Sequence, residues 1–158
     1  MKGRAPLRWG TWLAAAAIAM AGCGQKPFVI ADRRVCQTVD ATGKPGPEVT
    51  KLSVRDRTVY IWFSYLRARP GQAVKVKVTY TDAGGAEASD EVRDELKAGS
   101  GSSAAQFTGL NGGPLVPGKY QAEITNESGA AYGGALTFEV TGPSTATGSP
   151  APVGQPES

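Results

Sequence analysis

The middle of this 158-residue chain alternates apolar and polar side chains with a period of two. In residues 74–80, valine or tyrosine alternates with lysine or threonine, and residues 120–125 and 136–140 repeat the pattern. Successive side chains of a β-strand point to opposite faces, so this period is typical of strands with one buried face. Residues 58–66, TVYIWFSYL, are apolar at most positions. They predict a central strand that is covered on both faces.

Weaker segments and frequent turns extend this pattern through the rest of the middle region. Four more segments favour strands, namely residues 35–39, 50–54, 86–96 and 103–110. Gly, Pro, Asn and Asp separate the segments about every 10 to 15 residues, and no strong helical period lies between them. We therefore predict an all-β fold, either an antiparallel sandwich or a small barrel.

Residues 89–97, SDEVRDELK, fit this pattern least well. Val92 and Leu96 are four positions apart and follow the capping candidates Ser89 and Asp90, which suits a short helix. The same residues also suit an edge strand, whose charges discourage pairing with other sheets. We favour an edge strand or an irregular crossover.

A tight turn is expected within residues 115–120, LVPGKY. Pro117 presets a negative φ and Gly118 accepts a positive one, as the central positions of a type II turn require. The motif resembles the tyrosine corner of immunoglobulin-like and fibronectin type III sandwiches, in which the tyrosine hydroxyl bonds to backbone a few residues upstream. The resemblance implies an immunoglobulin-like antiparallel β-sandwich of about seven strands over residues 35–140. Tyr120 is then a structural residue, and Trp62 on the central strand is the core tryptophan that packs against the opposite sheet.

The first 22 residues have the pattern of an export signal. They hold three of the 17 basic residues and no acidic one, and residues 9–22 are an uncharged run rich in alanine. A positive region followed by an apolar region is typical of a secretory signal peptide. As a helix the run would measure about 21 Å, short of the roughly 30 Å hydrocarbon layer. The remaining chain has 14 basic and 14 acidic residues, so the excess positive charge belongs to the signal.

The signal ends in Met20-Ala21-Gly22-Cys23, which resembles the lipobox of bacterial lipoproteins. The resemblance implies that Cys23 carries a diacylglyceryl group and an N-acyl chain, and two or three acyl chains hold a protein stably on a membrane. Position 24 is Gly and not Asp. In a diderm bacterium, the rule of that family then implies the outer membrane, facing the periplasm.

Ordinary signal cleavage is a second interpretation of this junction, because Ala19-Met20-Ala21 also fits its small-x-small site. The protein would then be soluble, and Cys23 can pair with Cys36 in an oxidising compartment. Under lipidation, Cys36 is either buried as a small apolar side chain or free to form an intermolecular bridge. We favour the lipoprotein with a buried Cys36.

The chain thus divides into a signal peptide over residues 1–22, a lipidated tether over residues 23–34, the sandwich over residues 35–140 and a tail over residues 141–158. The tail holds four Pro and a single charge. It cannot bury enough apolar surface to offset its ordering entropy, so we predict that it is disordered. Within the tether, residues 28–30 are apolar and suit an additional first strand.

Catalytic chemistry has few candidate residues in this chain. The chain has no His, which excludes Ser-His-Asp and Cys-His arrangements, and one spare Cys provides too few ligands for zinc. Four clustered acids can in principle form a paired-carboxylate centre of the kind that glycosidases use: Asp90, Glu91, Asp94 and Glu95. We favour a solvated charged surface for these acids. We therefore predict no catalytic residue, no metal site and no cofactor.

Six basic residues lie within 23 positions that contain a single acid, Asp56: Arg55, Arg57, Arg67, Arg69, Lys75 and Lys77. Such a basic surface attracts phosphate head groups, lipopolysaccharide or an acidic partner protein. Alternatively, neighbouring strands pair their own opposite charges across the sheet, and each pair contributes little. We favour the second interpretation.

Together these patterns predict a lipid-anchored, non-catalytic binding or structural module of the bacterial cell envelope. The membrane is one partner, through the lipid on Cys23, and an envelope protein or glycan is another. Export and a balanced charge argue against nucleic acid. We expect a partner to bind at residues 74–80 or at the loop of residues 111–114. The alternative functions are an inhibitor of an envelope hydrolase and a carboxylate-dependent hydrolase in the periplasm.

Overall fold

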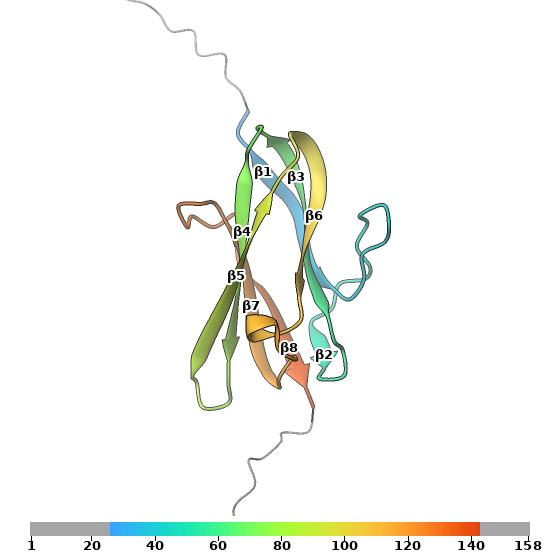
Figure 1. Ribbon diagram of the computed structural model, residues 1–158, viewed down its shortest axis with the longest axis vertical. Coiled ribbons are helices and arrows are strands. Elements are labelled where there is room, and N and C mark those ends of the chain that lie inside the picture. The colour runs from blue at the N-terminus through green and yellow to red at the C-terminus, as the bar shows by residue number, and fades with distance from the viewer. Residues whose placement is uncertain (1–25, 143–158) are drawn as a thin grey trace, which may run out of the picture.

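Residues 26–142, which the computed structural model describes, form two β-sheets packed face to face (Figure 1). The smaller sheet has three strands in the order β1-β3-β6: β1 (Val29–Cys36), β3 (Val59–Ala68) and β6 (Gly99–Phe107). The larger sheet has five strands in the order β2-β8-β7-β4-β5: β2 (Lys51–Ser53), β8 (Leu136–Thr141), β7 (Gly118–Thr125), β4 (Ala73–Thr81) and β5 (Glu87–Glu95). A turn of 3₁₀ helix, η1 (Leu110–Gly112), follows β6.

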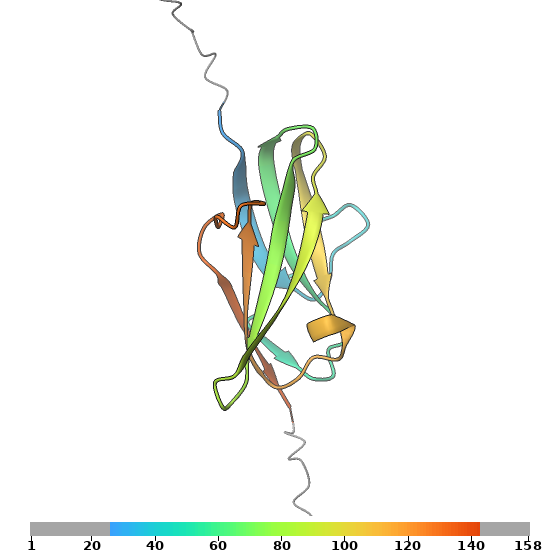
Figure 2. The same cartoon turned by 60° about the vertical axis from the view of Figure 1, so that its left-hand side comes forward.

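The chain crosses repeatedly between the two sheets, which encloses one core. Neighbouring strands are antiparallel, except that β2 runs parallel to β8. The described chain begins at one end of the sandwich and finishes at the opposite end (Figure 2). The predicted all-β antiparallel sandwich is confirmed. The structure has eight strands where about seven were expected.

The core follows the predicted alternation of side chains. Val74, Val76 and Val78 of β4 are buried between the sheets, whereas Lys75 and Lys77 lie on the outer face. The facing layer comes from one side of β3: Val59, Ile61, Phe63 and Tyr65. Both layers consist of apolar side chains that the sequence pattern assigned to buried strands.

The sandwich extends beyond its predicted limits at both ends. β1 begins at Val29, which pairs with Leu66 of β3, so much of the predicted tether over residues 23–34 belongs to an edge strand. β8 continues to Thr141, whose Oγ1 donates to Leu52 O at 3.1 Å, so this residue does not belong to the tail. The limits of 35–140 are therefore too narrow. The sequence pattern indicated only the two ends of β1, at residues 28–30 and 35–39, because the charged residues between them interrupt the alternation, and pairing with β3 joins them into one strand.

Residues 87–95 form an edge strand and not a helix. β5 pairs in register with all nine residues of β4. A continuous ladder of backbone hydrogen bonds outweighs the helical spacing of Val92 and Leu96, because helix and strand propensities are weak compared with tertiary pairing. The favoured prediction of an edge strand is confirmed.

Several predicted features lie outside the described residues. These are the signal peptide over residues 1–22, the acylated Cys23 and the tail from residue 143 onward. Within residues 26–142, no helix is long and apolar enough to cross a membrane.

Candidate binding surface

Trp62 lies on the outer face of the smaller sheet and not in the core. Its neighbours on β3, Ile61 and Phe63, are the residues that face the opposite sheet. The Trp62 indole is covered by the loop after β1, where Nε1 donates to Gly43 O at 2.8 Å, and by the Arg34 guanidinium, 5.5 Å from the ring centre. The predicted core tryptophan is therefore wrong. Around this position the odd-numbered residues of β3 face the core, whereas the expectation placed the even-numbered Trp62 there. Successive residues of a strand point to opposite faces, so a difference of one position moves the side chain outside.

Cys36 is buried on the same outer face, since Arg34 pairs with Trp62 and Cys36 pairs with Tyr60. It forms no disulfide with any residue that the structure describes. Burial raises the pKa of the Cys36 thiol, so the thiol stays protonated and unreactive near neutral pH. Pairing with Cys23 lies outside the described residues.

The loop after β1 leaves a hollow of about 400 Å³ over the Trp62 side chain. Asp40 shapes this loop, because its Oδ1 accepts hydrogen bonds from the backbone N–H groups of Thr42 and Lys44. A further hydrogen bond from the Thr42 hydroxyl lowers the pKa of the Asp40 carboxyl from its ordinary value. The indole is only 8% exposed, so it offers a ligand little surface for stacking.

Tyr120, near the start of β7, has the geometry of a tyrosine corner. Its hydroxyl donates to Val116 O at 2.9 Å and accepts from Val116 N at 3.1 Å. The ring stacks on Phe138 with centroids 5.0 Å apart and meets Phe107 edge-on. Burial raises the pKa of the Tyr120 hydroxyl. These contacts attach the chain ahead of β7 to the core, so the residue holds the fold together.

Pro117 and Gly118 form a bend and not the expected type II turn. The φ of Gly118 is 153°, whereas a type II turn needs about +80° at that position. Glycine is required here for a different reason, because a Cβ would lie 2.4 Å from Cε2 of Tyr80. The Tyr80 hydroxyl also donates to Pro117 O at 3.1 Å. The bend therefore packs directly against a tyrosine of β4.

The six predicted basic residues do not form one surface. Arg55 and Arg57 precede β3. Arg67 is the second-last residue of β3, and Arg69 is the first residue after it. β3 has ten residues, so roughly 30 Å of strand separates the two arginine pairs, which lie at opposite ends of the sandwich (Figure 1). A single basic patch made of all six residues is therefore wrong.

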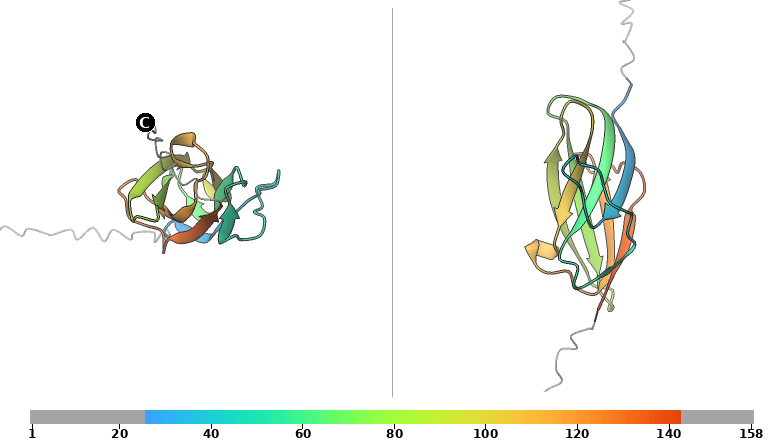
Figure 3. Two further views of the ribbon diagram at one scale, coloured as in Figure 1. Left: turned by 90° about the horizontal axis from the view of Figure 1, so that it is seen from below. Right: turned by 90° about the vertical axis from the view of Figure 1, so that its right-hand side faces the viewer.

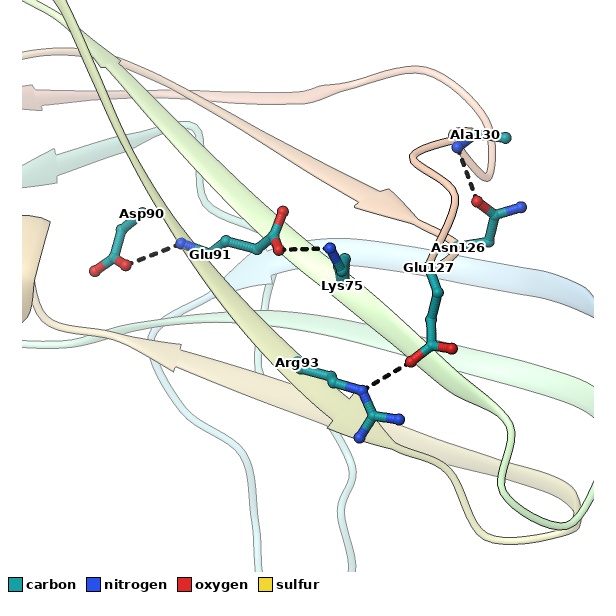
Figure 4. A network of polar contacts seen from close by, with 7 residues as sticks. All are labelled: Lys75, Asp90, Glu91, Arg93, Asn126, Glu127 and Ala130. Atoms are coloured by element: carbon teal, nitrogen blue, oxygen red, sulfur yellow. Dashed lines mark hydrogen bonds and ion pairs between the residues drawn. The ribbon is translucent and has the colours of Figure 1, made fainter.

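Lys75 and Lys77 lie on the outer face of the larger sheet, among acids of the neighbouring strands. Lys75 Nζ is 2.9 Å from Glu91 Oε1 (Figure 4). Lys77 lies between Glu91 and Glu123 in the register of the sheet. The favoured interpretation, in which neighbouring strands pair their own charges, is correct for Lys75.

Strand alternation separates the four candidate acids of β5. Glu91 and Glu95 lie on the outer face, whereas Asp90 and Asp94 lie on the inner face with the buried valines of β4. Four residues of strand place Asp90 and Asp94 about 13 Å apart, more than the roughly 5 to 9.5 Å between the paired carboxyl groups of glycosidases. Within residues 26–142, no three potential metal ligands of the His, Cys, Asp and Glu types come together.

Arg55 and Arg57 lie close to residues 111–114, one of the two segments where we expected a partner to bind. Arg55 and Arg57 line a hollow of about 550 Å³, and its other wall includes Gly112 at the end of η1 and the next two residues, Gly113 and Pro114. The end view shows these loops at the end of the sandwich where the described chain finishes (Figure 3). Residues 74–80, by contrast, belong to β4, which lies between β5 and β7 and has no free edge.

The hollow has a net positive charge, because two arginines line it and Asp56 is its single acidic residue. Asp56 Oδ2 accepts a hydrogen bond from Ser53 N at 2.7 Å and so bonds to the loop backbone. Neither Arg55 nor Arg57 makes an ion pair with any residue in the described part of the chain. The planar guanidinium fork suits carboxylate, phosphate and sulfate groups. Thr108 adds a hydroxyl to the lining, which the sequence did not single out because a lone polar residue in a loop has no distinguishing pattern.

The fold and its corner define the class of this protein. A three-stranded sheet faces a five-stranded one, and Tyr120 closes a tyrosine corner at the start of β7. These features define an immunoglobulin-like β-sandwich.

One solved structure supports this class. An immunoglobulin-like protein from Pseudomonas aeruginosa is similar with a TM-score of 0.52 and 10% identity, over 75% of this chain and 99% of that chain. A Niemann-Pick type C2 protein from the Japanese carpenter ant is 11% identical over 75% of this chain and 96% of that chain, with a TM-score of 0.36. No protein-family model and no curated protein matches the chain. At 10% identity, the first likeness shows the fold alone.

Proposed function

We propose that this chain is a non-catalytic binding module, attached to a bacterial envelope membrane through lipid on Cys23, that binds an acidic group at its far end. The observation that carries the proposal is the position of the arginine hollow. Arg55 and Arg57 lie at one end of the sandwich, and the described N-terminus leaves from the other (Figure 1). The anchor and the binding surface are thus separated by the full length of the strands.

The distances suit a module that binds away from the membrane. Five residues lie between Cys23 and the first residue of β1, so the two are at most about 20 Å apart in an extended chain. The strands then add roughly 30 Å between the tethered end and the hollow. In a diderm bacterium, the hollow would point into the periplasm from the outer membrane. The ligand class is a carboxylate, phosphate or sulfate group carried by an envelope protein or glycan.

Metabolic labelling tests the anchor. Cells that express the full chain are grown with a radiolabelled fatty acid, and Cys23→Ser is the matched control. We expect label on the unchanged chain, none on the variant, and release of the variant from the membrane fraction. An unlabelled wild-type chain would support ordinary signal cleavage and a soluble protein.

Crosslinking in native envelopes tests the binding end. A photo-crosslinking residue at Asn111, which is exposed in η1 next to the hollow-lining Gly112, should give an adduct that mass spectrometry identifies. The adduct should disappear in the Arg55→Gln, Arg57→Gln double variant and persist in Arg67→Gln, Arg69→Gln, which removes the same charge from the other end. Equal loss in both variants would indicate general attraction and contradict a site at the hollow.

A further inference from the structure

One strand of the sandwich lacks the usual protection of a sheet edge. Free edges invite pairing with another chain, so edge strands are usually short, bulged or charged. β2 has three residues, β1 has three charged residues and an irregular register, and β5 has six charged residues. β6, with the sequence GSGSSAAQF, is nine residues long and contains neither a charge nor a proline.

The free side of β6 presents backbone groups that another strand can bind. β6 pairs with β3 on one side, and its other side makes no backbone hydrogen bond with any residue between 26 and 142. Its first four residues are exposed, and its Gly, Ser and Ala side chains are too small to shield the edge. An extended segment placed there would satisfy these N–H and C=O groups, as in strand addition.

β5, the edge strand of the opposite sheet, lies next to this free edge of β6 (Figures 1 and 2). Val92 pairs with the inward-facing Val76, so Asp90, Val92 and Asp94 all point toward the side of the smaller sheet. The three strands of that sheet leave this row partly uncovered, and Val92 is 44% exposed. Both aspartates turn toward the β6 side. Asp94 accepts a hydrogen bond from the Ser103 hydroxyl, and Asp90 accepts one from the backbone N–H of Asn111 at 3.2 Å.

We propose that an extended segment of a partner protein adds to β6 as a fourth strand and presents a basic, an apolar and a basic side chain to Asp90, Val92 and Asp94. The acceptor row occupies alternate positions of β5. Alternate residues of the added strand also point to one face, so the recognised pattern is basic-x-apolar-x-basic. The backbone of β6 gives affinity and the β5 row gives selectivity, independently of the hollow at Arg55 and Arg57.

Charge complementarity favours this occupant over a second copy or the chain's own tail. A second copy would present its own β6, which has no charged side chain, and would bring two acidic rows together. Residues 143–158 contain no Lys or Arg and include four Pro, which cannot donate to a ladder. A basic segment neutralises both aspartates and covers Val92.

The probe is a fluorescently labelled peptide, Thr-Lys-Thr-Val-Thr-Lys-Thr, titrated into the full chain purified in detergent. Fluorescence anisotropy should show saturable binding that weakens with added salt. A peptide with Glu in place of both Lys should bind at least about tenfold more weakly. A peptide with N-methyl groups at alternate residues keeps the charges and loses backbone donors, so it should also lose binding.

Two matched variants assign the site. Asp90→Asn with Asp94→Asn keeps the amide oxygens that accept from Asn111 and Ser103, and should weaken binding about tenfold or more. Glu91→Gln with Glu95→Gln removes the same charge from the outer face of the same strand and should leave binding unchanged. Hydrogen exchange should show new protection confined to β6.

Three results would overturn the proposal. The first is the absence of saturable peptide binding. The second is equal binding of the N-methylated peptide, or equal weakening by the two double variants, which indicates charge attraction without strand addition. The third is concentration-dependent dimerisation that protects β6 without peptide, which assigns the edge to a second copy. None of these results bears on the lipid anchor or the arginine hollow, so failure here is distinguishable from failure of the proposed function.

Discussion

Trp62 and Tyr120 are both buried aromatic residues, yet they stabilise different parts of the molecule. Tyr120 lies in the core, and its hydroxyl satisfies both backbone groups of Val116. Trp62 lies outside the core and attaches the loop after β1 to the outer face of β3 through Gly43. The loss of either side chain should therefore have a different consequence. Tyr120 should control the stability of the whole fold, and Trp62 should control the access of reagents to Cys36 beneath the loop.

The variant Tyr120→Phe should lower the free energy of unfolding by about 1 to 2 kcal/mol, because the backbone groups of Val116 lose their buried partner. Urea denaturation gives the measurement. Tyr60→Phe is the matched control, since the side-chain hydrogen bonds of the described residues involve the hydroxyls of Tyr80 and Tyr120 and not that of Tyr60. Equal midpoints for wild type and Tyr120→Phe would argue against a stabilising corner.

The pH dependence of stability should report the same hydroxyl. Burial raises the pKa of Tyr120 above its ordinary value of about 10, so the folded state holds this proton more tightly than the unfolded state. Its contribution is complete below the unfolded pKa and is lost as pH rises through the folded pKa. Unfolding free energies measured from pH 7 to 11 should therefore converge for wild type and Tyr120→Phe. A difference that stays constant with pH would contradict this linkage.

Trp62→Phe should expose Cys36 without unfolding the protein. The variant loses the hydrogen bond to Gly43, worth about 0.5 to 1.5 kcal/mol, so the covering loop should open up to roughly tenfold more often. The measurement is the rate at which a thiol reagent modifies Cys36 in a Cys23→Ser background. The rate in Tyr60→Phe should match that of the parent protein. An unchanged rate in Trp62→Phe would mean that the loop does not control access.

At the scale of elements, pairing between strands explains which segments the sequence pattern identifies. β4 and β7 alternate clearly because each has one face in the core, and both were predicted closely. β1 and β6 lie at sheet edges and alternate weakly, so their predicted limits are displaced by several residues. The Gly and Ser residues of β6 have low strand propensity, and its pairing with β3 is what makes it a strand.

The Lys75–Glu91 ion pair should contribute little to the stability of the larger sheet. Both side chains are partly exposed, at 31% and 45%. A double-mutant cycle with Lys75→Ala and Glu91→Ala should give a coupling energy of about 0.2 to 1 kcal/mol that falls with added salt. A cycle with Lys77→Ala is the control, because Lys77 lies opposite Glu91 in register without forming an ion pair with it. Larger coupling for Lys77 would contradict the assigned pair.

At the scale of the whole molecule, the sandwich is elongated and its two ends differ. The described N-terminus and the Arg67–Arg69 pair lie at one end, and the arginine hollow and the described C-terminus lie at the other (Figures 1 and 3). The edges of the sheets run between these ends. Attachment, loop binding and strand addition would therefore use separate parts of the surface.

Comparison of two shortened chains tests the domain boundary. Residues 26–142 should unfold cooperatively, whereas residues 35–142 should have a much lower denaturation midpoint or fail to fold. The second chain lacks the part of β1 that pairs with β3 from Val29 to Arg34, which leaves Tyr65 and its neighbours paired with β6 alone. Urea denaturation followed by Trp62 fluorescence gives both midpoints. Equal midpoints would restore the boundary at residue 35.

The fold class, the main strands and the corner tyrosine could be predicted from the sequence, because they depend on local periodicity and on a motif of a few adjacent residues. The face that Trp62 occupies, the separation of the six basic residues and the free edge of β6 could not be predicted and became known from the folded chain. Periodicity fixes which side chains of one strand share a face. It does not fix the register between strands or their order in a sheet, since both depend on pairing between residues far apart in the chain.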